Sequence, residues 1–278
     1  MNLIVCTDCR GALDFEPGER ALTCRACGAL WPFRGGLPQL FRDAEIRGID
    51  RYMRWIYDGI PALHDPSVRL LVPLLELGGS ERQLRTSYMA RLELESLQPA
   101  AGPASRGGSS SPLRILEVSI GTGANLPYFR AGLAHLGTTP VELWGLDVSL
   151  GMLQQCLARP AKAEGLDLRL LLGDAHRLPF RDATFDRVLH VGGINAFRDR
   201  GEALKEMARV AKPGTPIVVV DEQLDPDRRH SLYHRLAFRA ATFYDARPRA
   251  PVEELPRSAK DVLVEQASRF FYTLRFRT

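Results

Sequence analysis

The sequence predicts an α/β protein in which a doubly wound, mostly parallel sheet follows a small metal-binding ribbon. Two observations support this prediction. From Leu113 to about residue 220, apolar runs typical of buried strands alternate with segments of helical periodicity. Within the first 27 residues, four of the five cysteines form two Cys-x-x-Cys pairs. The chain therefore combines two architectures.

The N-terminal segment carries its cysteines as two close pairs, Cys6 with Cys9 and Cys24 with Cys27. Fourteen residues separate the pairs, a spacing typical of a zinc ribbon, because tetrahedral zinc takes four thiolates at about 2.3 Å. The alternative, two disulfides, requires an oxidising compartment, and the first residues contain no charged region or cleavage site of a secretory signal. We therefore expect a zinc ribbon over residues 1–42 that is separate from the rest of the chain.

Length and composition limit the remaining possibilities. A chain of 278 residues is long enough for a core domain of about 200 residues and a small second domain. Its hydrophobic content of 45% and charged content of 25% are those of a globular protein, and its net charge of +4 favours nucleic acid only weakly. No apolar run approaches the roughly 18 residues of a membrane span. We expect a cytoplasmic protein without a transmembrane segment; the sequence does not indicate an oligomeric state.

The rest of the chain, over residues 45–278, is expected to form the second domain. It begins with helical periodicity over about 45–98. Residues 98–112 are rich in Pro, Gly and Ser without an apolar anchor, which predicts a flexible loop. Residues 222–260 lie between two expected strands and form an insertion beside the expected site.

The alternating region predicts five strands and three helices. The strands are expected over Leu113–Val118, Val141–Leu146, Leu168–Leu172, Phe185–His190 and Pro216–Val220. The helices are expected over Pro127–Leu136, Leu150–Leu157 and Arg200–Val210. Because ligands of doubly wound sheets bind at the carboxyl ends of the strands, the residues that follow each strand are the candidates for a site.

The residues at these strand ends suit a nucleoside-containing ligand. After the first strand, Gly121 and Gly123 let the backbone approach a ligand at a helix N-terminus. The dinucleotide fingerprint is not met, because Leu126 occupies its third glycine position. Asp147, after the second strand, is positioned to bind a ribose diol, and Asp174, after the third, to bind an adenine amino group. Each acid alone is also consistent with a helix N-cap, but together they indicate a cofactor site.

Four segments carry a resemblance to a known family: ILEVSIGTGANL, GLDVSLGML, GDAHRLPFRDATFDRV and ALKEMARVAKPG. With them, residues 113–221 resemble a class I S-adenosylmethionine-dependent methyltransferase of the ubiquinone/menaquinone C-methyltransferase-like group. The resemblance implies a seven-stranded Rossmann-like sheet, with Phe270–Arg277 as its last, antiparallel strand. It also implies S-adenosylmethionine as the cofactor.

The same resemblance implies roles for individual residues. The loop from Gly121 to Gly123 contacts the methionine end of the cofactor, and the segment over residues 55–60 is similar to the family's helix over the cofactor. The implied cofactor-binding residues are Tyr57, Glu117, Gly121, Gly123, Asn125, Asp147, Val148, Asp174 and Ala175.

The ribbon has a resemblance of its own. Gly28 after the second cysteine pair, the Trp31-Pro32 step and the Gly36-Leu37-Pro38 step are similar to zinc ribbons fused to some RNA methyltransferases. They are also similar to the small zinc-ribbon partner of tRNA and protein methyltransferases. Trp31 stands where that pattern usually has tyrosine.

The acceptor side is less defined by sequence. His190, at the end of the fourth strand, is a candidate general base, since an acceptor hydroxyl or acidic carbon must lose a proton; alternatively, it only hydrogen-bonds the backbone. In the 222–260 segment, Leu232, Leu236 and Phe243 share one helical face flanked by arginines. This face is expected to be a lid over an apolar substrate, a peripheral membrane contact, or an ordinary amphipathic helix.

Two functions follow from these patterns. The favoured one is methylation of a small apolar molecule such as a quinone, a lipid or a secondary metabolite. The alternative is methylation of RNA, with the ribbon docking the nucleic acid. RNA binding should bring a surplus of basic residues, yet arginines and acids nearly balance over residues 1–42. A non-catalytic, cofactor-binding scaffold is a third reading, because the acceptor residues are not identified.

Overall fold

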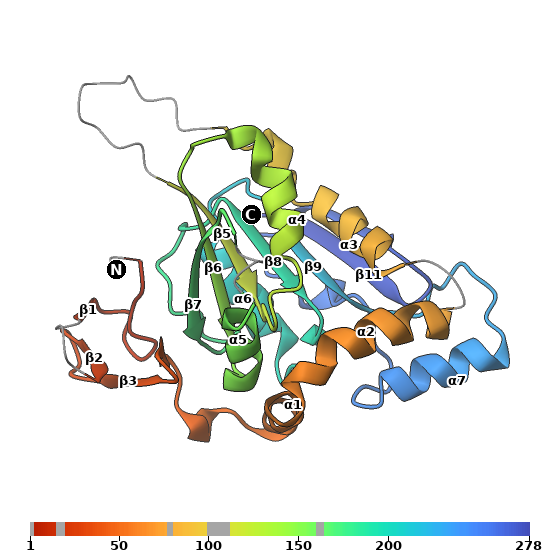
Figure 1. Ribbon diagram of the computed structural model, residues 1–278, viewed down its shortest axis with the longest axis horizontal. Coiled ribbons are helices and arrows are strands. Elements are labelled where there is room, and N and C mark those ends of the chain that lie inside the picture. Colours follow the sequence, from red (N-terminus) through yellow and green to blue (C-terminus); the bar gives the residue numbers. More distant parts are fainter. Residues whose placement is uncertain (1–2, 15–19, 77–79, 99–111, 160–163) are drawn as a thin grey trace.

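The computed structural model describes residues 3–14, 20–76, 80–98, 112–159 and 164–278. It consists of a seven-stranded sheet with helices on both faces and a four-stranded ribbon at one edge of that sheet (Figure 1). Among these residues, no helix is both long enough and apolar enough to cross a membrane.

Five parallel strands form the centre of the large sheet. They are β5 (Leu113–Val118), β6 (Val141–Asp147), β7 (Asp167–Leu172), β8 (Arg187–Val191) and β9 (Ile217–Glu222). Each lies within two residues of its expected bounds. The sheet order is β10-β11-β9-β8-β5-β6-β7, so the winding reverses between β5 and β8. Both faces of β5 and β8 are buried, which explains their nearly continuous apolar runs.

The opposite edge of the sheet is antiparallel. The strand β11 (Phe271–Arg277) pairs antiparallel with both β9 and β10 (Lys260–Gln266). The expected antiparallel last strand is therefore present. The neighbouring β10 was not indicated by the sequence, because it lies at the edge, where Val262 and Val264 are exposed among charged residues.

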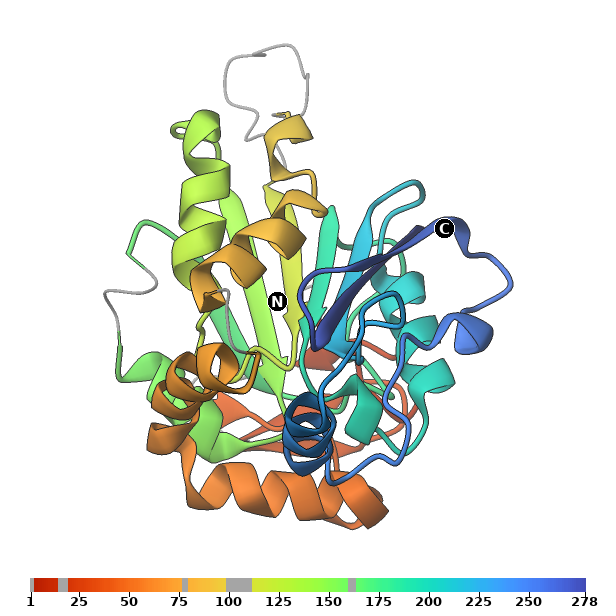
Figure 2. The ribbon, with the colours of Figure 1, turned by 90° about the vertical axis from the view of Figure 1, so that its right-hand side faces the viewer.

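Helices cover the two faces of the sheet (Figure 2). One face carries α3 (Glu81–Ala90), α4 (Leu126–Leu133) and α5 (Leu150–Leu157), and the other carries α6 (Arg200–Val210). The three expected helices are present, although α4 ends three residues before its expected end. The start of α5 is fixed by Ser149, whose side chain accepts a hydrogen bond from the Met152 amide at 3.2 Å.

Three further helices lie at the carboxyl ends of the parallel strands. Two of them are α1 (Gly48–Gly59) and α2 (Pro61–Glu76), which together with α3 confirm the helical periodicity expected over 45–98. The segment over 222–260 contains α7 (Leu232–Ala241), which contacts α2. Figures 1 and 2 place α1, α2 and α7 on the same side of the molecule. This arrangement closes the space above the strand ends.

The ribbon is a separate sheet that contacts the edge of the large sheet. Its strands are β1 (Leu13–Asp14), β2 (Ala21–Cys24), β3 (Leu30–Arg34) and β4 (Leu37–Pro38). Directly after β4, the Leu40 amide donates to the Leu172 carbonyl of β7 at 2.9 Å, and Gln39 pairs with Leu172 in parallel. The ribbon thereby covers the edge of β7, which would otherwise expose unpaired backbone groups.

The ribbon and the sheet also share one hydrophobic core. Trp31 and Leu40 are buried in the same cluster as Trp144 and Phe180 of the larger part. The guanidinium of Arg10 binds the buried carboxylate of Glu206 on α6 at 2.8 Å. The expectation of a separate module is therefore wrong in one respect: about 40 residues are too few to bury a core alone, so the ribbon completes its core against the sheet.

The Pro/Gly/Ser-rich loop expected over 98–112 lies almost entirely outside the described residues, which stop at 98 and resume at 112. Its flexibility therefore stays a prediction.

Candidate active site and cysteine cluster

A cavity of about 550 Å³ lies at the carboxyl ends of the parallel strands. Its walls come from the loops after β5, β6, β7 and β8, from α1 and α2, and from the segment that follows β9. They are predominantly apolar, with a few carboxylates at defined places. A cavity of this size near the switch point of the sheet is the expected position of a ligand site in this architecture.

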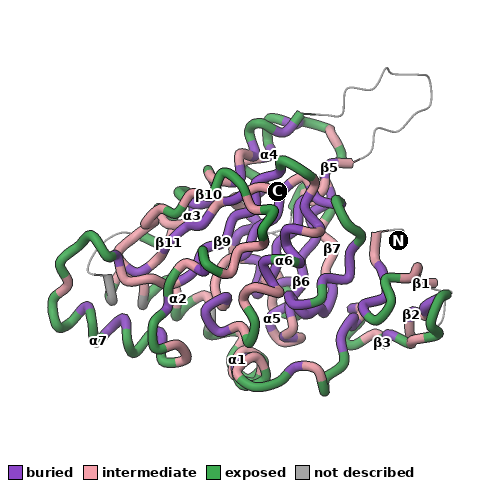
Figure 3. The backbone as a smooth tube through the Cα atoms, turned by 180° about the vertical axis from the view of Figure 1, so that it is seen from behind, coloured by how far each residue is buried: buried purple, intermediate pink, exposed green. Residues whose placement is uncertain are grey.

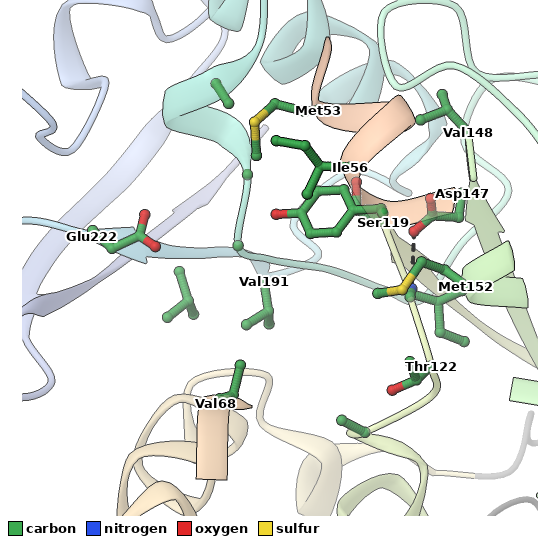
Figure 4. A pocket seen from close by; sticks show the side chains of 18 of the residues that line it. Met53, Ile56, Val68, Ser119, Thr122, Asp147, Val148, Met152, Val191 and Glu222 are labelled. Atoms are coloured by element: carbon green, nitrogen blue, oxygen red, sulfur yellow. Dashed lines mark hydrogen bonds between the residues drawn. The ribbon is translucent and has the colours of Figure 1, made fainter. Parts of the chain in front are cut away.

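Eight of the nine residues expected to bind the cofactor line this one cavity. They are Tyr57, Glu117, Gly121, Asn125, Asp147, Val148, Asp174 and Ala175. Tertiary structure thus brings together residues that are spread over more than 110 positions of the sequence. Figure 4 shows Asp147 and Val148 on one side of the pocket, with Thr122 of the neighbouring loop nearby.

The carboxylate of Asp147 connects the loops that follow β5 and β6. One oxygen accepts a hydrogen bond from the Gly121 amide at 3.0 Å, drawn dashed in Figure 4, and the other accepts from the Ser149 amide at 2.9 Å. Each carboxylate oxygen can accept a second hydrogen bond. Asp147 therefore fixes the geometry of both loops at the cavity wall.

The two glycines after β5 have different roles. Gly121 lines the cavity at φ +55°, a conformation that favours glycine. Gly123 is absent from the cavity wall, and the expectation that it binds the cofactor is not supported by its position. A Cβ at Gly123 would lie 2.6 Å from Leu126 and 2.7 Å from the Cys156 sulfur, so this glycine permits close packing of the loop on α5.

The carboxylate of Asp174 is bound by two side chains, a histidine and an arginine. Its oxygens accept from His176 Nδ1 at 2.6 Å and from the Arg198 guanidinium at 2.7 Å. Burial by itself raises the pKa of Asp174, but the hydrogen bonds outweigh it and hold the pKa at about 2. Arg198 also binds Asp50 of α1 at 2.5 Å. Asp174 is thus an anion that ties α1 to the strand ends.

Sequence reasoning missed a buried polar cluster from α3. The amide oxygen of Asn125 accepts hydrogen bonds from Arg85 at 2.6 Å and from the Tyr88 hydroxyl at 2.6 Å. Its amide nitrogen donates to Glu117 at 2.6 Å. Arg85 and Tyr88 are three residues apart in a helix, which was the only signal in the sequence. The cluster orients Asn125 and Glu117 at the cavity wall.

Acidic residues of α1 and α2 fasten these helices over the site. Asp58 accepts from the Ser149 hydroxyl at 2.6 Å and from the Gly151 amide at 3.1 Å. Asp65 accepts from the hydroxyl of Thr122 and pairs with Arg159 at 2.5 Å. Sequence alone assigned these acids no role, because their partners lie more than 50 residues away.

His190 is not placed to act on an acceptor. Its side chain is fully buried, does not belong to the cavity wall, and donates from Nδ1 to the Val118 carbonyl at 3.0 Å. Burial lowers the pKa of His190 to about 4, so the ring is neutral at pH 7. The structure thus supports the alternative reading, a histidine that hydrogen-bonds the backbone, and the role of general base is not supported.

A second carboxylate instead faces the cavity at the end of β9. Glu222 lines the cavity, and Figure 4 shows it across the pocket from Asp147. The Tyr244 hydroxyl donates to Glu222 at 2.6 Å. Beside it, Asp221 is buried and accepts from the Asn195 amide at 2.7 Å. Burial, followed by the repulsion from Glu222, raises the pKa of Asp221 well above its usual value.

Two tyrosines accompany Glu222 at this end of the cavity. Tyr57 and Tyr244 both line the wall, and burial together with the charge of Glu222 raises the pKa of each phenol. Both therefore keep their protons, and the Tyr244 hydroxyl donates to Glu222. Sequence reasoning missed Glu222, because it is the last residue of β9, which is apolar up to Asp221.

The four N-terminal cysteines converge on one point. Their sulfurs all lie within 4.8 Å of one another, with Cys6 and Cys27 at 3.7 Å and Cys9 and Cys24 at 3.4 Å. Tetrahedral zinc with bonds of about 2.3 Å places its sulfur ligands about 3.8 Å apart. The indole of Trp31 donates to the Cys6 sulfur at 3.4 Å. The donor set and its spacing fit a structural zinc ion.

The fold and the site define a class of protein. An antiparallel strand between β9 and β10, the reversal between β5 and β8, and acids after β6 and β7 together characterise a class I S-adenosylmethionine-dependent methyltransferase domain. Residues 116–219 match the family described as methyltransferase domain, and residues 1–36 match the family described as Trm112p-like protein. The chain thus contains a class I methyltransferase domain that includes residues 116–219, and its first 36 residues are similar to Trm112p-like proteins.

Curated relatives match part of the chain. Demethylmenaquinone methyltransferase from Renibacterium salmoninarum is 38% identical over 109 residues, which are 39% of this chain and 40% of that protein. Norajmaline N-methyltransferase from Rauvolfia serpentina is 31% identical over 140 residues, 45% of this chain and 44% of that protein. The chain thus spans less than half the length of either relative.

A solved structure has the same fold over a larger share of the chain. Phosphoethanolamine N-methyltransferase 2 from Haemonchus contortus, in complex with S-adenosyl-L-methionine, superposes with a TM-score of 0.57. The match covers 87% of this chain and 61% of that one at 14% sequence identity. At this identity the similarity shows the fold.

The buried state of His190 predicts a defined pH dependence of stability. Its folded pKa of about 4 lies below the unfolded value near 6.5, so protons bind preferentially to the unfolded chain in that window. His190 should therefore cost about 2 kcal/mol of unfolding free energy between pH 7 and pH 5. His190→Gln keeps a donor for Val118 and should lose correspondingly less stability over this range. Urea unfolding of both proteins at the two pH values measures the difference; equal losses would contradict the assignment.

Proposed function

We propose that this protein transfers a methyl group from S-adenosylmethionine to a small apolar molecule. The observation that carries the proposal is the continuity of the cavity, which runs from Asp147 to a wall of aromatic side chains. That wall consists of Phe238, Phe243, Phe270 and Phe271. A predominantly apolar cavity of about 550 Å³ suits two small ligands placed end to end better than a polymer.

The Asp147 end fits the cofactor. Asp147 would accept hydrogen bonds from the ribose hydroxyls, Asp174 and Ala175 would face the adenine, and the Gly121 loop would face the methionine end. Beside the backbone of Gly192, a Cβ would meet no atom within 4 Å, so open space for a ligand exists there. When bound, S-adenosylmethionine supplies an electrophilic methyl group on a positively charged sulfur.

The Glu222 end suits the acceptor. An acceptor hydroxyl or acidic carbon loses its proton as the new bond to the methyl group forms, and a base within reach accelerates this transfer. We assign that role to Glu222, whose carboxylate is oriented by the Tyr244 hydroxyl. The raised pKa of Asp221 lets the Asp221 carboxyl hold a proton beside Glu222.

Ion pairs on the ribbon argue against the alternative function, the methylation of RNA. Four of its arginines are already paired with acids: Arg10 with Glu206, Arg25 with Asp14, Arg34 with Asp43 and Arg42 with Asp8. Binding of an RNA backbone requires a surplus of positive charge. The Trm112p-like match nevertheless makes RNA the competing substrate that an experiment must include.

For the cysteine cluster, we propose one zinc ion with a structural role. The ligand set of four thiolates is closed, without a position for water or substrate. Because Cys6 and Cys24 belong to the core shared with the sheet, the ion would hold the ribbon against the edge of β7.

Transfer of a labelled methyl group tests the proposed activity. The protein, incubated with isotope-labelled S-adenosylmethionine and either a lipid and quinone extract or cellular RNA, should label an apolar small molecule. Asp147→Asn should weaken cofactor binding by about 1.5–3 kcal/mol, measured by calorimetry, because a charged acceptor is lost. Asp167→Asn is the control, since Asp167 is exposed and lies outside the cavity wall. Label in RNA alone would overturn the proposal.

Removal of the charge at Glu222 tests the assignment of the base. Glu222→Gln should slow methyl transfer by about 10²–10⁴-fold while cofactor affinity stays unchanged. Glu253→Gln, at an exposed glutamate outside the cavity, should behave like the parent protein. Single-turnover kinetics measure the chemical step. An unchanged rate for Glu222→Gln would exclude Glu222 as the base.

Metal analysis tests the zinc site and its coupling to the fold. Protein purified under reducing, chelator-free conditions should contain one zinc per chain. Chelation should lower the thermal stability of the whole protein in a single transition, because the ribbon and the sheet share a core. Cys9→Ser should lose the metal, whereas Cys156→Ser, remote from the cluster, should retain it. Metal-free wild-type protein, or two separate transitions, would contradict this prediction.

A further inference from the structure

The helices over the cavity carry large apolar side chains on their outer faces. Figure 3 shows exposed stretches along α1 and α7. The side chains concerned, each at least 42% exposed, are Tyr52, Trp55, Ile60, Leu63, Leu70, Leu74, Leu232, Tyr233, Leu236 and Phe243. We refer to these residues as the apolar surface. An exposed cluster of this size marks an interaction site far more often than an accident of sequence.

The apolar surface is continuous across three helices. Tyr52 stacks on Trp55 with ring centroids 6.3 Å apart and meets Phe243, which follows α7, edge-on at 6.5 Å. Between α2 and α7, the Tyr233 hydroxyl donates to the Leu74 carbonyl at 2.8 Å. These contacts link α1 to the segment after α7, and α2 to α7, within the region that carries the exposed apolar side chains.

The cavity opens on this surface. Ile60, Leu63 and Phe243 line the cavity and are also at least half exposed. They form the rim between the apolar interior and the outer face. An apolar molecule can therefore pass from the surface into the cavity without crossing a polar barrier at this rim.

Positive charge borders the apolar surface. Five arginines on or beside α1, α2 and α7 are exposed and form no side-chain ion pair with a described residue: Arg51, Arg69, Arg229, Arg235 and Arg247. By contrast, three acids of α1 and α2 bind partners in the methyltransferase domain: Asp50 binds Arg198, Asp58 binds Ser149 and Asp65 binds Thr122. The five arginines therefore keep their charge available at the surface of these helices.

We propose that the apolar surface docks on an anionic phospholipid bilayer and that the acceptor enters the cavity from that bilayer. The proposal rests on the proposed function for the identity of the acceptor, but the docking itself does not. Leucines of such a face insert at the acyl boundary, and Trp and Tyr side chains settle at the level of the headgroups. Arginines near the surface bind the lipid phosphates.

The charges favour a bilayer over a second copy of the chain. In a two-fold contact through this surface, the arginines of both copies would face each other, and like charges at an interface are unfavourable. Anionic headgroups supply the opposite charge around an apolar interior. The composition of the surface, apolar in its centre and cationic at its border, matches that of an interfacial helix face.

Vesicle cosedimentation tests the docking without relying on catalysis. The full-length protein should bind vesicles of phosphatidylcholine mixed with phosphatidylglycerol, and should bind phosphatidylcholine alone at least about tenfold more weakly. The double variant Leu232→Ser, Leu236→Ser should lose about tenfold or more of the binding to mixed vesicles. Neither leucine lines the cavity, so calorimetric binding of S-adenosylmethionine should stay unchanged.

A matched control distinguishes the effect of this surface on vesicle binding from the effect of any exposed apolar side chain. Leu30, on the ribbon, is 63% exposed and Leu236 is 62% exposed, so Leu30→Ser removes a similar exposed side chain elsewhere. Leu30→Ser should leave vesicle binding unchanged. Arg229→Gln with Arg235→Gln should reduce the preference for anionic vesicles.

Three results would overturn the proposal. They are no binding of the wild-type protein to mixed vesicles, equal effects of the Leu232/Leu236 and Leu30 variants, and loss of self-association instead of vesicle binding in the double variant. Failure of methyl transfer with intact vesicle binding would instead count only against the proposed function.

Discussion

One carboxylate holds the centre of the site together. Asp147 accepts backbone hydrogen bonds from the loops after β5 and β6, and those loops form the floor of the cavity. Because both loops emerge from buried parallel strands, the carboxylate sits at 9% exposure in a position that the sheet fixes. The hydroxyl of the neighbouring Ser149 donates a hydrogen bond to Asp58 and so connects this loop to α1. The floor and the cover of the cavity therefore depend on the same few hydrogen bonds.

The polar groups around the cavity divide into two poles. At one pole, Asp174 is held as an anion by His176 and Arg198. At the other, Glu222 is accompanied by tyrosines that keep their protons. Between the two poles the wall is predominantly apolar, with side chains from α1, α2 and the segment after β9. This separation suits a charged cofactor at one end and an apolar acceptor at the other.

Much of the fold was predictable from local patterns. The central parallel strands could be identified because both of their faces are buried, which makes their apolar runs almost continuous. Eight of nine expected cofactor contacts line one cavity for a related reason, since parallel strands bring their carboxyl ends to one edge. Gly123 does not line the cavity. A glycine can serve close packing as well as the approach of a ligand, and sequence does not distinguish the two roles. The role of general base expected for His190 is not supported by its burial, because the position of a residue along a strand does not indicate which face of the sheet its side chain occupies.

The sequence by itself determined the class of fold, the strand-end acids and the two cysteine pairs, because each depends on spacing along the chain. Tertiary structure decided the rest. Glu222 faces Tyr244 and Tyr57 only after the chain has folded over the strand ends. The ribbon joins the core of the sheet because Leu40 pairs with Leu172, more than 130 residues away. Such contacts depend on which edges and faces are adjacent in the folded protein, and the local periodicity of a sequence does not specify this.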